Sequence, residues 1–160
     1  MQGVELREIN KGDALLDQVE FLFRQLYAHL ADAGMQMPMV EGGEKLWRQS
    51  SEKLLGGRFG ILVAAVQNDK AVGFAHGVLR YAPDYLGGLK VGFITNIFVD
   101  PAYRSFGAGK KMVEYLENWF RTKGTHSCEL QVLTGNAQGI EFWTRCGFSR
   151  ELLQMRKKMS

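Results

Sequence analysis

The spacing of hydrophobic residues changes several times along the chain, and each change predicts a different element. Apolar side chains recur at every third or fourth position over residues 15–30, which predicts an amphipathic helix. From residue 59 the pattern becomes a nearly continuous apolar run that ends at Asn68 and Asp69, which predicts a strand and a hairpin turn. The complete set of expected elements is strands at 4–9, 59–66, 72–78, 91–99, 128–133 and from 148 onward, and helices at 15–30, 46–55, 112–120 and 137–146.

These elements follow one another in the order β α α β β β α β α β. Helices that bracket antiparallel strands, followed by a strand, a helix and a strand, predict an α+β fold in which a mostly antiparallel central sheet carries helices on both faces. The chain has 160 residues, which suits a single hydrophobic core, and it contains no repeat or linker. We therefore expect one domain over residues 1–160.

Composition excludes several classes of protein. Hydrophobic residues make up 46% of the chain and charged residues 23%, which argues against disorder, and no apolar run approaches the ~20 residues of a membrane helix. The first ten residues carry Glu5, Arg7 and Glu8 without an apolar core, so they do not resemble a secretory signal. We expect a cytoplasmic protein.

Charge and cysteine content argue against two kinds of partner. The net charge of +3 comes from 20 basic and 17 acidic residues, and this balance is too weak to predict nucleic-acid binding. Cys128 and Cys146 have neither the spacing of metal ligands nor that of a disulfide framework. We interpret both as packing thiols and expect no metal site.

A glycine-rich segment between the strand at 91–99 and the next helix is the clearest candidate site. The first amides of a helix lack internal partners and lie at the positive end of the helix dipole, so they can bind a phosphate if side chains stay away. Gly107 and Gly109 would keep side chains away, and Lys111 adds positive charge or is a solvated helix residue. The alternative is a plain glycine turn. The segment reads Arg104, Ser105, Phe106, Gly107, Ala108, Gly109, Lys110.

Two common phosphate-binding motifs do not fit this segment. A P-loop requires glycine five residues before Gly109, where Arg104 stands, and Ser or Thr after Lys110, where Lys111 stands. A dinucleotide fingerprint requires a third glycine at the position of Met112, and it follows a parallel strand. Both NTPase chemistry and a Rossmann site are disfavoured.

The remaining pattern, Arg-x-x-Gly-x-Gly over residues 104–109, resembles the GCN5-related N-acetyltransferases. A second signature of that family follows at the expected separation: residues 136–143 resemble its Asn-x-x-Ala-x-x-Phe-Tyr helix, which ends in Gly147 and Phe148. Together the two signatures cover about residues 91–148. The resemblance implies the GNAT-like acyl-CoA N-acyltransferase fold, with acetyl-CoA as cosubstrate.

The resemblance also assigns roles to individual residues. The backbone of Ile97, Phe98 and Val99 would pair with the pantetheine arm where neighbouring strands splay apart, and the segment from Arg104 through Lys110 would hold the pyrophosphate. Asn136 would hydrogen-bond the arm, with a helix N-cap as the alternative or additional role. Phe142 and Trp143 would lie near the thioester, with core packing as the alternative for Phe142.

The resemblance does not supply catalytic residues. Phe93, Thr95 and Gln131 stand at positions where family members carry a base, and Trp143 replaces the usual tyrosine acid, so the catalytic residues stay unknown. We expect an N-acetyltransferase that moves the acetyl group to a primary amine of a small molecule or protein N-terminus by direct attack in a ternary complex. The alternative is a non-catalytic acyl-CoA-binding or sensing domain. The oligomeric state stays open, a homodimer included.

Overall fold

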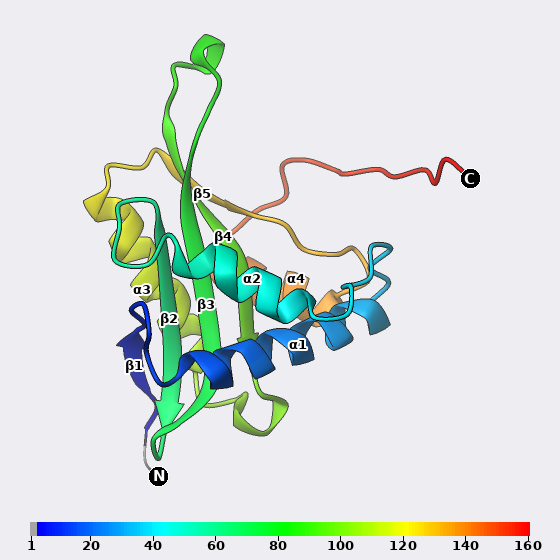
Figure 1. Cartoon of the computed structure of the whole chain (residues 1–160). Helices are drawn as coiled ribbons and strands as arrows, with labels where there is room; N and C mark the ends of the chain where they lie inside the picture. Colours follow the sequence, from blue (N-terminus) through cyan, green and yellow to red (C-terminus); the bar gives the residue numbers. More distant parts are fainter. Residues whose placement is uncertain (1–2) are drawn as a thin grey trace.

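A five-stranded sheet lies at the centre of residues 3–160, the part of the chain that the computed structural model describes (Figure 1). The strand order is β1-β2-β3-β4-β5. Neighbours from β1 to β4 are antiparallel, and β5 is parallel to β4. The strands are β1 (Glu5–Glu8), β2 (Gly60–Gln67), β3 (Lys70–Tyr81), β4 (Lys90–Val99) and β5 (Ser127–Leu130).

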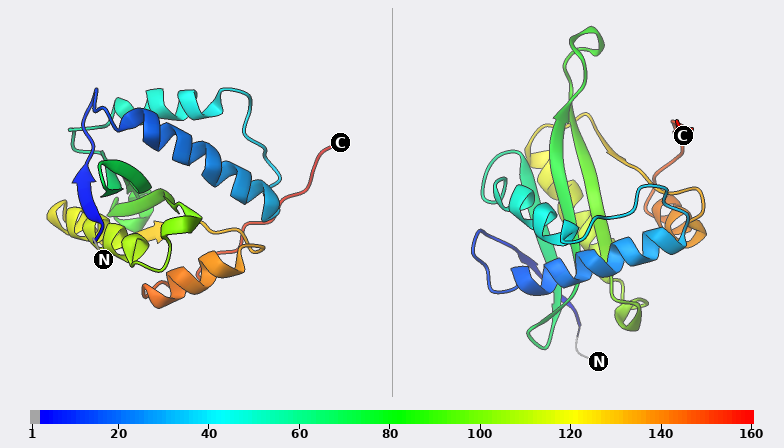
Figure 2. Two further views of the ribbon diagram at one scale, coloured as in Figure 1. Left: turned by 90° about the horizontal axis from the view of Figure 1, so that it is seen from below. Right: turned by 45° about the vertical axis from the view of Figure 1, so that its right-hand side comes forward.

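Helices cover both faces of this sheet. The first two, α1 (Leu16–Asp32) and α2 (Gly43–Glu52), lie on one face, and α3 (Ala108–Thr122) and α4 (Ala137–Arg145) lie on the other (Figure 2). Two short 3-10 helices, η1 (Asp84–Leu86) and η2 (Pro101–Tyr103), occur in connections. The expected α+β architecture is confirmed.

The continuous apolar run of β2 is explained by burial on both faces. Alternate side chains of a strand point to opposite faces. Leu62 and Ala64 belong to the core cluster under α1, whereas Ile61 and Val63 belong to the cluster under α3. The chain then reverses through Asn68 and Asp69, which have positive φ angles of 50° and 60° and form the expected hairpin turn.

Close packing of α3 on the sheet depends on two glycines beneath Phe120. A Cβ atom at Gly92 would lie 2.5 Å from the Phe120 ring, and one at Gly77 would lie 2.9 Å from it. The ring is only 2% exposed. The missing side chains therefore create the space that seats the C-terminal half of α3.

The expectation of a final strand from Phe148 is wrong in this structure. Residues 149–160 contain no helix or strand and are exposed along their whole length. The last expected internal strand is also shorter, because β5 ends at Leu130 rather than at residue 133. A strand forms only where a neighbouring backbone supplies hydrogen-bond partners, and the local pattern does not show that. None of the described helices is long and apolar enough to cross a membrane.

Candidate functional site

The outer edge of β4 is only half paired. Toward β3, the ladder continues as far as Val99, which lies opposite Gly73. Toward β5, the register covers only Val91 to Ile94. The β5 side of residues 95–99 is thus outside the described sheet ladder, and these include Ile97, Phe98 and Val99. The pairing ends at Ile94 because β5 itself ends at Leu130.

The side chains on this part of β4 pack into the two hydrophobic cores. Phe98 is 6% exposed and packs with the cluster under α1, whereas Ile97 and Val99 pack against the cluster under α3. The Val99 carbonyl accepts a hydrogen bond of 2.8 Å from Arg104 Nε. What the edge offers a ligand is therefore mainly backbone, with the Val99 carbonyl already occupied by Arg104.

The glycine-rich segment connects this edge to the start of α3. Asp100 accepts a hydrogen bond of 2.9 Å from the Ala102 amide, which fixes the turn at the end of β4. The Arg104 guanidinium lies 5.4 Å from the centre of the Phe98 ring. Ser105 and Gly107 both have φ angles of 75°, and α3 begins directly after Gly107. The helix N-terminus thus lies close to the end of the open strand edge.

Gly107 and Gly109 are required in this segment for different structural reasons. Gly107 is the N-cap of α3 in the left-handed region, and a Cβ atom there would meet nothing within 4 Å. At Gly109, a Cβ atom would lie 3.2 Å from the Phe142 ring. Gly107 fits the expected open space before the helix, whereas Gly109 lets α4 approach α3. The sequence interpretation, which assigned both glycines to phosphate access, did not include this contact.

Asn136 and Trp143 occupy opposite ends of the second signature. The Asn136 side chain accepts a hydrogen bond of 3.0 Å from the Gly139 amide and caps α4, so the N-cap alternative is confirmed. Trp143 is 8% exposed and makes edge-to-face contacts with Phe142 and Phe148, at centroid distances of 5.0 and 5.3 Å. Trp143 is a core residue, and Phe142 stands between it and the start of α3.

The three positions examined for a base hold no titrating side chain. Phe93 is 8% exposed and lies under Arg80, whose guanidinium carbon is 3.6 Å from the ring centre. Gln131 Nε2 donates a hydrogen bond of 3.4 Å to Gln154 Oε1. Thr95 is the extra residue of a bulge between β3 and β4. The expectation that these residues cannot act as bases stands.

The bulge brings Thr95 to His76, a contact that sequence reasoning missed. Thr95 Oγ1 donates to the His76 carbonyl at 3.1 Å and lies 2.5 Å from His76 Nδ1, so Nδ1 is the donor in that second contact. His76 Nε2 is buried and has no hydrogen-bond partner among the described residues. Burial lowers the pKa of His76 to about 4. The imidazole is therefore neutral at pH 7. The contact was missed because no sequence pattern predicts a bulge at this point.

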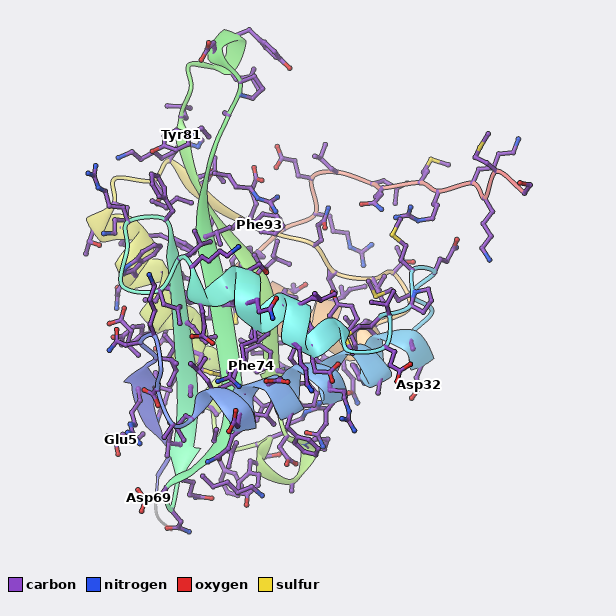
Figure 3. The ribbon with its side chains drawn as sticks, viewed as in Figure 1. Glu5, Asp32, Asp69, Phe74, Tyr81 and Phe93 are labelled. Atoms are coloured by element: carbon purple, nitrogen blue, oxygen red, sulfur yellow. The ribbon has the colours of Figure 1, made fainter. Side chains whose placement is uncertain are left out.

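The β3–β4 hairpin extends beyond the sheet core (Figure 1). Figure 3 places Tyr81 where the β3–β4 hairpin leaves the sheet and Phe93 further down β4. The hairpin carrying η1 projects beyond the helices, and Tyr81 and Tyr85 are 56% and 85% exposed (Figure 1). Elsewhere, Arg48 of α2 forms an ion pair of 2.9 Å with Glu20 of α1, which holds the two helices together, and one of 2.9 Å with Glu52 of its own helix.

Curated proteins with similar sequences are named as N-acetyltransferases. The chain is 36% identical over 70 residues to a glucosamine 6-phosphate N-acetyltransferase of Trypanosoma brucei brucei, covering 44% of this chain and 46% of that protein. It is 32% identical over 68 residues to the enzyme of the same name from Arabidopsis thaliana, covering 42% and 44%. The chain thus matches less than half the length of these curated relatives.

Solved structures share the whole fold at low sequence identity. An aminoglycoside N-acetyltransferase, AAC(6')-Iy, in complex with CoA superposes with a TM-score of 0.76 at 21% identity, over 99% of this chain and 98% of that one. A Bacillus halodurans protein, BH1408, superposes with a TM-score of 0.82 at 19% identity, over 98% and 99%. The sequence model of the Acetyltransferase (GNAT) family matches residues 16–148. With that match over most of its length, the chain belongs to the GNAT family of acetyltransferases.

Proposed function

We propose that this protein transfers the acetyl group of acetyl-CoA to a primary amine. The observation that carries the proposal is the half-open edge of β4, which ends close to the N-terminus of α3. An extended arm with amide groups can pair with a strand edge, and a phosphate suits the first amides of a helix. The two features follow one another along the chain, as an arm joined to a pyrophosphate requires.

The described residues divide the binding between backbone and side chains. The backbone of Ile97 and Phe98 offers hydrogen-bonding groups to the pantetheine arm, and the amides after Gly107 offer donors to the pyrophosphate. Arg104 and Lys110 add positive charge at that end. The Asn136 amide nitrogen, which the N-cap contact through Oδ1 does not use, supports a further hydrogen bond to the arm.

Bound acetyl-CoA supplies an activated thioester carbonyl. The amine nitrogen attacks this carbon, the carbon–sulfur bond breaks, and the thiolate leaves while the nitrogen loses a proton. Phe93, Thr95 and Gln131 cannot take that proton, and His76 is buried with a lowered pKa of about 4. At pH 7, deprotonating an amine of pKa ~10.4 costs about 4.6 kcal/mol, whereas one of pKa ~8 costs about 1.4 kcal/mol. We therefore expect weakly basic amines as acceptors.

Amino sugars are the first acceptors to test. The matched relatives are named for acetylating glucosamine 6-phosphate, and one structural neighbour is named for aminoglycosides. With saturating acetyl-CoA and limiting acceptor, kcat/KM should rise with pH and level off near the amine's own pKa. A plateau near neutral pH that is the same for every amine would contradict this account by revealing a base on the protein.

A matched pair of glycine variants tests the cofactor site. Gly107 and Gly124 stand at the two ends of α3, both have positive φ angles, 75° and 72°, and a Cβ atom at either meets nothing within 4 Å. Gly107→Val and Gly124→Val thus carry similar backbone strain. In calorimetric titrations with CoA, we expect at least tenfold weaker binding for Gly107→Val alone. Equal affinities in the two variants would refute the site.

Turnover separates the enzyme from the alternative, a domain that binds acyl-CoA without reacting. The alternative is supported by the absence of a titrating group at the three base positions. Thiol release is measured with acetyl-CoA and a panel of primary amines that includes amino sugars. Tight CoA binding without thiol release for any amine would favour the binding domain.

A further inference from the structure

The bulge in β4 lies at the point where this strand leaves β5. Ile94 is the last residue of β4 in the ladder with β5. In the ladder with β3, Ile94 and Asn96 are both paired, and Thr95 between them is the extra residue of the bulge. A bulge bends the strand that carries it. The bend therefore falls at the beginning of the open edge, residues 95–99.

Two hydrogen bonds attach the Thr95 side chain to His76 of β3. The Thr95 hydroxyl donates to the His76 carbonyl at 3.1 Å and accepts from His76 Nδ1 at 2.5 Å. Thr95 is half-buried, whereas His76 is only 4% exposed. The pair thus joins the first residue of the open edge to a side chain in the interior of the molecule.

Aromatic side chains pack against the imidazole of His76 on its α2 side. The Trp47 ring meets the imidazole edge-on, with the ring centres 5.9 Å apart, and Trp47 itself stacks on Phe23 at 4.2 Å. Figure 1 shows α2, which carries Trp47, crossing the sheet in front of β3. This packing restricts rotation of the imidazole, so Nδ1 stays directed at Thr95.

Packing alone does not explain an imidazole at this position. Nδ1 carries the proton that Thr95 accepts, so Nε2 offers a lone pair, and this buried atom has no hydrogen-bond partner among the described residues. An unpaired buried acceptor destabilises the fold, and an apolar ring, such as that of Phe74 on the same face of β3, would avoid this cost. The hydrogen bond to Thr95 is what an apolar ring could not supply.

We propose that His76 is a positioning residue for acetyl transfer. Through Thr95 it holds the bulge, and the bulge fixes the direction of the open edge relative to the start of α3. The thioester stands at the far end of the pantetheine arm from the pyrophosphate, so its place depends on that direction. The inference rests on the proposed function, because it requires the arm to pair with the open edge. His76 acts through Thr95 and needs no contact with acetyl-CoA.

Two pairs of variants separate positioning from packing. Thr95→Val removes the hydroxyl, whereas Thr95→Ser keeps it. His76→Phe removes the donor, whereas His76→Asn keeps a donor nitrogen bonded to Cγ, as Nδ1 is. A displacement of ~1 Å can slow a reaction ~10²-fold, so we expect kcat to fall about tenfold or more in Thr95→Val and His76→Phe and to stay within about threefold of wild type in the other two. The variants that keep the bond have the smaller side chains, so lost packing predicts the opposite order of rates.

Kinetics of thiol release, with saturating acetyl-CoA and an amino sugar, measure kcat for each variant. Calorimetric affinity for CoA should change by less than about threefold throughout, because the pyrophosphate end of the site lies beyond the bulge. The double variant of His76→Phe and Thr95→Val should be no slower than either single variant, since both remove the same bond. Ile61→Val, in the core cluster under α3, is the control that lowers stability and leaves kcat unchanged.

The outcomes distinguish this inference from the function on which it rests. Turnover by the wild type, with the same kcat in Thr95→Val and His76→Phe, would overturn the positioning role and leave the acetyltransferase activity standing. Rates that follow packing, with His76→Asn as slow as His76→Phe, would also overturn the positioning role alone. A wild type that releases no thiol with any amine would overturn the proposed function and this inference with it.

Discussion

The buried imidazole of His76 makes a specific prediction about pH and stability. Its pKa is about 4 in the folded protein, against an ordinary value of 6.5, because the ring is desolvated. As the pH falls below 6.5, the unfolded chain binds a proton that the folded chain resists, so stability is lost between pH 6.5 and pH 4. The loss is about 2 kcal/mol at pH 5 and about 3 kcal/mol below pH 4.

Urea unfolding at pH 7 and pH 5 measures this loss. Tryptophan fluorescence is a suitable signal, since the Trp47 ring lies 5.9 Å from the imidazole. Between the two pH values, the wild type should lose about 2 kcal/mol more than a His76→Gln variant. His126 is exposed and serves as a control for the loss of an imidazole alone. The same pH dependence in wild type and His76→Gln would refute the reasoning.

Three further predictions concern packing, capping and reactivity. Phe120→Ala should cost about 3–5 kcal/mol in a denaturant titration, because the ring is buried over two glycines; a cost below about 1 kcal/mol would contradict that packing. Asn136→Ala should lower the free energy of unfolding by about 1 kcal/mol, while Asn136→Asp keeps the cap, and equal losses would count against it. The raised pKa of Cys128 should make the folded protein resist iodoacetamide at pH 8 at this residue until urea exposes it; rapid labelling of the native chain would show that the thiol is accessible.

Elements that depend on local patterns were predictable. The apolar run of β2 and the turn at Asn68 and Asp69 follow from burial on both faces and from residues that tolerate positive φ. The glycine-rich segment was also recognisable, because a strand, a glycine turn and an amphipathic helix follow each other directly. In each case the cause lies within a dozen residues.

Features that depend on distant partners were not predictable. Residues 149–160 have a composition compatible with a strand, but they form none because no described backbone pairs with them. The bulge at Thr95 arises from the register of two strands, and the Gly109–Phe142 contact arises from two helices meeting. In the candidate site, the resemblance indicated the region of Trp143 but could not show that its ring enters the core.

The half-open edge of β4 has a consequence for how this fold diverges. Main-chain atoms are common to all residues, and only proline lacks the amide donor, so a ligand held by them imposes almost no choice of side chain. At residues 97–99 the side chains are constrained instead by packing in the two cores, which requires only a suitable volume and an apolar surface. Recognition of a constant cosubstrate can thus persist while the sequence drifts. Proteins that share 19–21% identity with this chain and superpose on it with TM-scores of 0.76 to 0.82 illustrate that freedom.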